Sequence, residues 1–301
     1  MVTVLRPLST GELLDRTFYL YRNNFLVFLG ITAIPQLFIL AVQLGGAVMM
    51  MGRQGTRAML LIVMGYLLFY LAIFISQAPT IVAVSNLNLE KPIGIRSSYS
   101  SAKRSLPRVI WIVFLIFVTM VAFFSVVSIT TALLVAATDV TGQPWVSGVV
   151  AFVVIAAAIV WALRWILNWS LVIPVTVLEG GWFRVSIRRS KTLVKGSRSR
   201  IFVIYFLMGL FAAVIGFMIQ FLLILSLQLF RMRDMHTIQA AILGMQAIGI
   251  FVSTSLVGAL GTISLSLIYY DQRVRKEGFD LQLMMSTLES GAQNAAAAPA
   301  S

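Results

Sequence analysis

The chain has no cysteine and a single histidine, and only 11% of its 301 residues are charged. Without cysteine, a disulfide framework, a thiolate metal site and a cysteine nucleophile are excluded. His236 alone does not supply the ligands of a metal cluster. Soluble domains carry about a quarter charged residues, so this scarcity of charge excludes a chain whose main solvent is water.

Acidic side chains are especially scarce, with 10 Asp and Glu against 23 Lys and Arg. The cores of the long apolar runs contain no Asp, Glu or His. The residues required for a buried acid–base pair, an intramembrane protease or a carboxylate proton relay are therefore missing. Walker, zincin and serine-elbow motifs are also missing from the sequence. We therefore expect a protein that is not an enzyme and that uses no metal or cofactor.

Apolar residues, by contrast, make up 59% of the chain, and its mean hydropathy is +0.95. A helix that crosses a bilayer needs about 20 mostly apolar residues. Six runs reach this length, at about 25–50, 58–82, 109–136, 146–178, 201–230 and 238–270. The sequence predicts an all-α integral membrane protein with one six-span domain over 1–280 and a cytoplasmic tail at 281–301 that is disordered at its end.

The net charge of +13 indicates topology rather than nucleic-acid binding, because the cations lie between apolar runs and not on a soluble face. The hydrophilic stretches alternate between a short set and a longer set. Eighteen Lys and Arg lie on the longer set, which includes the termini, and four lie on the short set. The positive-inside rule then predicts a multi-pass protein of the bacterial inner membrane with both termini in the cytoplasm.

An internal repeat is indicated by the segments that precede the first, third and fifth runs. Each has a stripe at i, i+4, i+7 and i+11, the spacing of one helical face. The stripes are Leu14, Phe18, Tyr21 and Phe25; Ile95, Tyr99, Ala102 and Leu106; and Phe183, Ile187, Ser190 and Val194. We expect three copies of an interfacial amphipathic helix followed by a transmembrane hairpin, the alternative being chance amphipathicity beside any span.

Arg164 is the one cation inside a predicted span, where it lies among Trp161, Trp165 and Trp169. A charge in a span normally faces the bundle interior, a cavity or a partner, so Arg164 is a candidate contact for an anionic group such as a lipid phosphate. The alternative is that Arg164 snorkels to the interface and the tryptophans form an interfacial belt, because this span is longer than a bilayer requires.

The third amphipathic segment carries a dense basic cluster. Its cations are Arg184, Arg188, Arg189, Lys191, Lys195, Arg198 and Arg200. Basic amphipathic helices attract anionic headgroups by roughly 1 kcal/mol per cation near the surface. We expect anionic membrane lipids as partners, with Arg184, Arg188, Lys191 and Lys195 as candidate contacts, although the cluster could serve topology alone.

Two further predictions follow from the prolines and the small residues in the spans. Pro35 and Pro174 are expected to kink their spans, and glutamines either donate to the carbonyls that each proline frees or face a cavity. These glutamines are Gln36, Gln43, Gln220 and Gln228. The row Gly258, Thr262 and Ser266 is expected to let a neighbouring helix approach closely.

Three stretches resemble a known family. They are LRPLSTGELLDRTFYLYRNNFLVFLGI at the start, VIPVTVLEGGWFRVSIRRSKTLVKGSRSRIF in the centre and YYDQRVRKEGFD near the end. Together they are similar to the glycerophosphoryl diester phosphodiesterase membrane domain family. Its name comes from members in which a similar membrane domain is fused to a phosphodiesterase domain, and this sequence shows no such catalytic domain. The resemblance therefore implies a fold and not a reaction.

The sequence favours a non-catalytic membrane protein that contacts lipid and acts as a scaffold or docks an unidentified protein partner. A transporter or lipid-translocating protein that uses Arg164 and the kinked spans is the first alternative. A membrane subunit associated with a phosphodiesterase-type lipid enzyme, as the family name suggests, is the second.

Overall fold

A computed structural model describes residues 7–52, 55–139, 144–227 and 234–278, and these residues form helices without any strand. The helices are α1 (Thr10–Asn23), α2 (Phe25–Met51), α3 (Gly55–Asn88), α4 (Ile95–Ala102), α5 (Leu106–Asp139), α6 (Pro144–Trp169), α7 (Val172–Glu179), α8 (Phe183–Val194), α9 (Arg198–Leu227) and α10 (Met235–Glu277). The predicted tail at 281–301 lies outside the described residues, as does Gln228.

Six stretches of these helices are long and apolar enough to cross a membrane, which confirms the predicted fold class. They are Phe25–Met50, Thr56–Asn88, Leu106–Thr138, Trp145–Glu179, Arg198–Ser226 and Met235–Glu277. The chain is therefore a multi-span helical membrane protein. The observed helices extend beyond most of the predicted runs because polar residues at their ends continue the helical hydrogen bonding.

The fourth span differs from the continuous run that the sequence predicts. Its helix stops at Trp169, turns at Ser170 and Leu171, and resumes as α7. Proline cannot donate to the carbonyl four residues earlier and its ring crowds that carbonyl, so Pro174 destabilises an intact helix across Ser170. In the first turn of α7 its missing N–H costs nothing, because the first N–H groups of a helix have no intrahelical partner. Pro35, by contrast, lies inside an unbroken α2.

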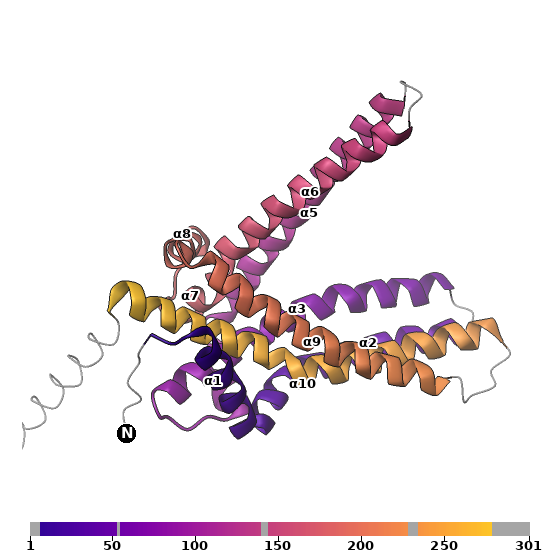
Figure 1. The fold of residues 1–301 in the computed structure, drawn as a ribbon. Coiled ribbons are helices and arrows are strands. Elements are labelled where there is room, and N and C mark those ends of the chain that lie inside the picture. Colours follow the sequence, from indigo (N-terminus) through magenta and orange to yellow (C-terminus); the bar gives the residue numbers. More distant parts are fainter. Residues whose placement is uncertain (1–6, 53–54, 140–143, 228–233, 279–301) are drawn as a thin grey trace, which may run out of the picture.

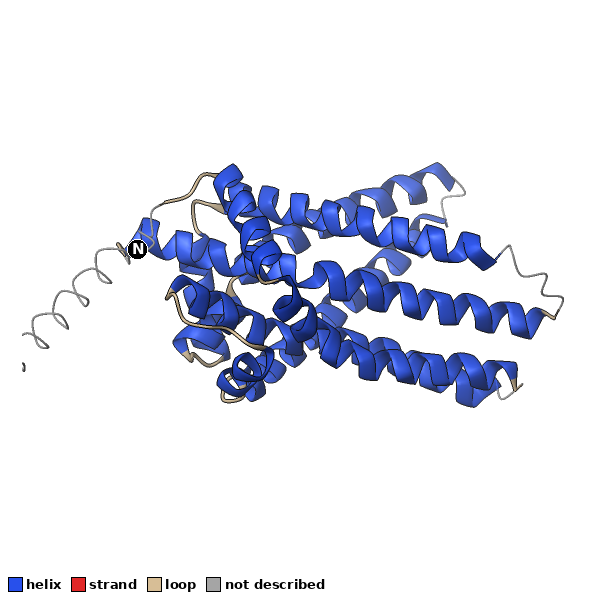
Figure 2. Cartoon of the chain, turned by 90° about the horizontal axis from the view of Figure 1, so that it is seen from below, coloured by secondary structure: helices blue, strands red, loops and turns tan. Residues whose placement is uncertain are grey.

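The spans divide into a bundle and a separate hairpin. The helices α2, α3, α9 and α10 run side by side, whereas the hairpin α5–α6 diverges from them (Figure 1). The hairpin contacts the rest of the structure mainly through α3, α7, α8 and α9. The short helices α1, α4, α7 and α8 gather at one end of the structure together with the last turns of α10, as Figure 2 also shows. We call this end the basic end.

The predicted amphipathic helices are α1, α4 and α8, each followed by a hairpin, and burial repeats among them. Thr17, Ser98 and Ser186 occupy equivalent positions, just before the second residue of each stripe, and all three are 0% exposed. The fourth residue of the next helix is Phe28, Val109 or Ile201, and none of these is more than 1% exposed. The burial pattern thus agrees with three copies of one unit.

The face of α1 that is buried within the protein differs from its apolar stripe. The buried face of α1 is formed by Leu13 and Thr17, while Phe18 and Phe25 of the stripe are 38% and 36% exposed. In a membrane the surroundings are themselves apolar, so large apolar side chains need not turn inward and small ones let helices approach. Phe18 instead packs edge-to-face on Phe211 of α9, with ring centroids 5.3 Å apart.

Small residues bring the spans of the bundle together. A side chain added at Gly65 of α3 would meet Gln43 of α2, and one added at Gly249 of α10 would meet Gln220 of α9. In the predicted small-residue row of α10, Ser266 is fully buried, and a Cβ at Gly258 would lie 3.9 Å from Thr32 of α2. Close packing of this kind is the main source of helix association where apolar burial gives little driving force.

Candidate functional site

The four candidate cations of the basic cluster share one face of α8 and its end. Arg184, Arg188, Lys191 and Lys195 follow one another at i, i+4, i+7 and i+11, and all four are exposed. The opposite face holds the buried Ser186, Ser190, Leu193 and Val194. None of the described acids pairs with these four cations, so the helix presents a row of positive charge on the side that faces away from the structure.

Two other cations of the cluster, Arg189 and Arg200, point inward to acidic partners. Arg189 binds Glu179, with Nε 3.1 Å from Oε2, and Glu277, with Nη2 2.7 Å from Oε2. The pKa of Arg189 is raised mainly by its hydrogen bond to Glu277, and also by Glu179, against the opposing effect of burial. The cluster is thus divided between structural ion pairs and a free face.

Asp271 of α10 forms the second ion-pair centre. Its side chain is 1% exposed and binds Arg200 of α9 at 2.7 Å and Arg275 at 3.0 Å. Its carboxylate also accepts a hydrogen bond from the backbone N–H of Leu8 at 2.9 Å. These bonds join the segment before α1, the start of α9 and the end of α10. The closing stretch of the resemblance supplies Asp271 and Arg275.

Buried serines attach α8 to the break in the fourth span. Ser190 Oγ donates to the carbonyl of Asn168 at 2.8 Å and accepts from the N–H of Leu171 at 3.3 Å. Thr176 of α7 donates to Ser186 Oγ at 3.0 Å. Ser190, the weakest position in the predicted stripe, therefore satisfies backbone groups that the break exposes, and these bonds fix the orientation of the cationic face.

Arg164 lies on the exposed face of α6, and no described residue forms an ion pair with it. It is five residues from the end of α6 at Trp169, which corresponds to about 8 Å along the helix axis. Its tryptophan neighbours face the rest of the hairpin: Trp161 stacks on Phe123 of α5 at 4.5 Å, and Trp165 contacts Trp169 at 4.1 Å.

Tyrosines, and not the predicted glutamines, bind the carbonyls freed by proline. Tyr99 of α4 donates to the carbonyl of Ile31, four residues before Pro35, at 2.8 Å. Tyr205 of α9 donates to the carbonyl of Ser170, four residues before Pro174, at 3.3 Å. Burial raises the pKa of Tyr99 to about 12, so its hydroxyl remains a donor at neutral pH. These donors come from helices distant in sequence. Of the two roles predicted for the glutamines, that of donor to the freed carbonyls is not seen for Gln36, Gln43 or Gln220, whereas Gln36 lines a cavity.

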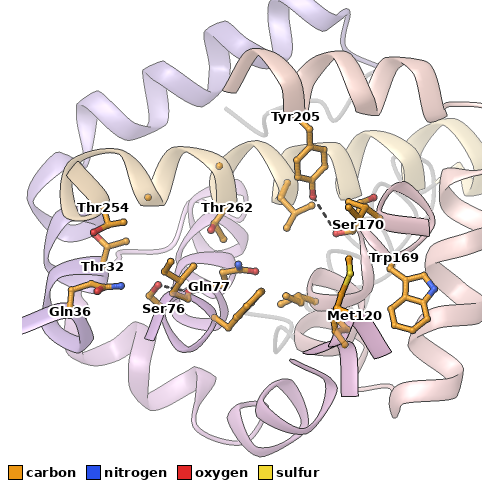
Figure 3. A pocket seen from close by; sticks show the side chains of 18 of the residues that line it. Thr32, Gln36, Ser76, Gln77, Met120, Trp169, Ser170, Tyr205, Thr254 and Thr262 are labelled. Atoms are coloured by element: carbon orange, nitrogen blue, oxygen red, sulfur yellow. Dashed lines mark hydrogen bonds between the residues drawn. The ribbon is translucent and has the colours of Figure 1, made fainter. Parts of the chain in front are cut away.

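A cavity of about 440 Å³ lies where the hairpin meets the bundle. Figure 3 shows polar side chains of α2, α3 and α10 on one side of it and Met120 and Trp169 of the hairpin on the other. The polar group comprises Thr32, Gln36, Ser76, Gln77, Thr254 and Thr262. Arg164 is not among the residues that line this cavity, although Trp165 and Trp169 are.

Comparison of the chain with protein-family models, curated proteins and solved structures found no match. Within the described residues, no group of three or more His, Asp and Glu could hold a metal ion. The geometry identifies two features that could bind a ligand, the cationic face of α8 and the cavity beside the hairpin. The class of the protein, a multi-span helical membrane protein, follows from its helices.

Proposed function

We propose that the chain is a non-catalytic membrane protein that binds anionic lipid headgroups through α8 and acts as a lipid-contacting scaffold. The observation that carries the proposal is the row of four exposed cations at Arg184, Arg188, Lys191 and Lys195, none of which pairs with an acid in the part of the chain that the structure describes. Cations that serve only to balance acids would be paired, as Arg189 and Arg200 are. Unpaired cations on one side of an interfacial helix attract anionic headgroups at roughly 1 kcal/mol each.

Apolar groups beside this row favour a membrane surface as the partner. Trp182 and Val185 are 64% and 63% exposed at the start of α8. An exposed tryptophan and a basic face are typical of helices that lie in the headgroup region. Arg108 lies 5.9 Å from the centre of the Trp182 ring and donates to the carbonyl of Gly180 at 3.0 Å, so this apolar surface is held in place.

We also propose that the basic end faces the cytoplasm of a bacterial cell, because the positive-inside rule favours that side. Single cysteines can test this in the naturally cysteine-free chain with a thiol reagent that does not cross membranes. The exposed positions Thr56 and His236 should react in intact cells, whereas Ser101 and Thr192 should not. Labelling of Ser101→Cys or Thr192→Cys in intact cells would contradict the orientation.

The other hypotheses have weaker support. A transport path along Arg164 would place its guanidinium in the cavity, which other residues line. Its exposed position close to the end of α6 instead supports snorkelling, since an arginine stem can carry its charge to a nearby interface. The resemblance to the phosphodiesterase membrane domain family, and an association with a lipid enzyme, remain proposals that rest on the quoted stretches alone.

The experiment compares two variants that each lose four positive charges. One replaces Arg184, Arg188, Lys191 and Lys195 by Gln, and the matched control replaces Lys91, Arg96, Lys103 and Arg104, which are also exposed at the basic end but do not form one helical row. Each protein is reconstituted in mixed phosphatidylglycerol and phosphatidylcholine, extracted, and analysed for retained lipid by mass spectrometry.

We expect wild type and the control variant to retain phosphatidylglycerol preferentially, and the α8 variant to lose this preference by about fivefold or more. Thermal unfolding should show that both variants fold. Undiminished phosphatidylglycerol retention in the folded α8 variant would contradict the proposal. An equal loss in both variants would show a diffuse effect of charge and no site on α8.

A further inference from the structure

The cavity between the hairpin and the bundle contains polar groups without partners. The side chain of Gln36 is almost fully buried, and none of the described residues forms a hydrogen bond with its amide. Gln77 Oε1 and Ser170 Oγ are buried and equally unpaired. An unpaired buried polar atom costs about 1–3 kcal/mol, so Gln77 Oε1 and Ser170 Oγ, with the unbonded amide of Gln36 beside the same cavity, point to a ligand or water that hydrogen-bonds with them.

The groups that line the cavity determine the charge of this ligand. No Asp, Glu, Lys, Arg or His is among the residues that line it. An ionised phosphate or ammonium group would therefore remain without a counterion in surroundings of low dielectric constant. Gln77 Oε1 requires a donor, whereas the amide nitrogens of Gln36 and Gln77 require acceptors. The polar part of a matching ligand is thus uncharged and carries both a hydroxyl group and carbonyl or ether oxygens.

The remaining walls indicate what the rest of the ligand is. They are apolar and come largely from the hairpin, including Ile116, Met120, Trp165 and Ile166. Two adjoining hollows along α5 and α6 continue this surface: one shares Met120 with the cavity and the other shares Ile166. Apart from Ser and Thr hydroxyls, their linings are hydrocarbon and aromatic. A polar pocket that leads into apolar hollows suits a headgroup with attached hydrocarbon chains.

We propose that this cavity binds an uncharged lipid with a free hydroxyl group, of the class that diacylglycerol represents. Its hydroxyl donates to Gln77, its ester oxygens accept from the glutamine amides, and its chains follow the apolar hollows of α5 and α6. A volume of about 440 Å³ lies within the range of small-molecule sites and holds the glycerol part and the start of the chains. This site is separate from the cationic face of α8. It selects uncharged lipids, whereas the face of α8 attracts anionic ones.

Two glycines provide a matched test of occupancy. A Cβ at Gly261, which lines the cavity, meets no atom within 4 Å, so Gly261→Leu adds apolar bulk to the cavity wall from α10 and its Cβ does not clash. A Cβ at Gly209 of α9 also meets nothing within 4 Å, but Gly209 does not line the cavity. Both changes replace a helical glycine by a better helix former. Gly209→Leu is therefore the control for the substitution itself.

The probe is a photoreactive diacylglycerol in phosphatidylcholine nanodiscs that contain the full chain. Wild type and Gly209→Leu should be labelled equally, and the label should map to α5, α6 or α10. Gly261→Leu should reduce labelling to background. Gln36→Leu and Gln77→Leu should each reduce labelling about 2- to 10-fold, the range for loss of one hydrogen bond. Photoreactive phosphatidic acid with the same chains should give only background labelling.

Equal labelling of wild type and folded Gly261→Leu would overturn the proposal and indicate that water fills the cavity. Stronger labelling by phosphatidic acid would overturn it as well. If Gly261→Leu fails to fold, two other measurements decide the result. They are the loss of wild-type labelling when unlabelled diacylglycerol competes, and the labelling of the two glutamine variants. The α8 variant with four Gln substitutions should retain full diacylglycerol labelling, so failure of this site and failure of the anionic-lipid site are distinguishable.

Discussion

The bundle and the hairpin are both apolar but are held in place differently. In the most apolar stretch of the first and sixth spans, which belong to the bundle, 28% of the residues are buried. The corresponding share is 11% in the third span and 0% in the fourth, the two arms of the hairpin. Hydropathy therefore identifies a span but does not show whether protein or lipid covers it. The bundle depends on contacts within the chain, and the hairpin depends on the membrane and on its base.

The largest expected difference concerns Asp271, whose ion pairs close the bundle at the basic end. Asp271→Asn keeps the shape but leaves Arg200 and Arg275 without their counterion. Arg200 and Arg275 are 20% and 38% exposed, so solvent partly screens the charges left behind, but the loss of both ion pairs should still lower the unfolding temperature in detergent. Asp15→Asn, at an exposed position of α1, should leave it unchanged. Similar unfolding temperatures for both variants would show that the ion pairs do not hold the bundle.

A matched pair of isoleucines compares the two regions directly. Ile263 of α10 is 0% exposed, whereas Ile129 of α5 is 60% exposed. Ile263→Ala should destabilise the protein by about 2–5 kcal/mol, because it leaves a cavity in close-packed surroundings. Ile129→Ala should have little effect, since lipid or detergent chains fill the space. Equal losses of stability, measured by denaturant unfolding in the same micelles, would refute the division into bundle and hairpin.

The smallest expected effect separates the two tyrosines that bind proline-freed carbonyls. Tyr99→Phe removes a 2.8 Å hydrogen bond within the bundle, and Tyr205→Phe removes a 3.3 Å bond at the base of the hairpin. Hydrogen bonds between membrane helices contribute about 0.6 kcal/mol on average, and the shorter bond should contribute more. Thermal unfolding should therefore fall more for Tyr99→Phe than for Tyr205→Phe. The reverse order would mean that the base of the hairpin is the more constrained site.

The sequence predicts local features well and the partners of individual groups poorly. The six spans and three amphipathic helices follow from apolar runs and stripes, which neighbouring residues determine. The row of cations on α8 is also local, because it needs only helical spacing. The hydrogen bond between Tyr99 and Ile31 joins residues 68 positions apart, and the cavity draws its lining from seven helices. The periodicity of a single segment does not predict contacts between residues that are this far apart in the sequence.

The break at Ser170 shows an intermediate case. Pro174 is visible in the sequence, and its steric effect predicts a disturbance four residues earlier. Whether the helix kinks or stops depends on which side chains form hydrogen bonds with the exposed backbone groups. Here Ser190 of α8 donates to one carbonyl and accepts from one N–H at the break, so that stopping becomes favourable. The serine that weakens the amphipathic stripe is the residue that makes this turn possible.

The length of α10 raises the question of how its depth in the bilayer is set. At 43 residues it is about 65 Å long, roughly twice the thickness of a hydrocarbon core. Its side chains from Met235 to Tyr270 carry no permanent charge, so hydropathy alone would let the helix slide or tilt by several turns. The pairs between Asp271 and Arg200 and between Glu277 and Arg189 fix it against α9 and α8. The position of α10 along the bilayer normal is therefore set by the neighbouring helices and not by its own apolar length.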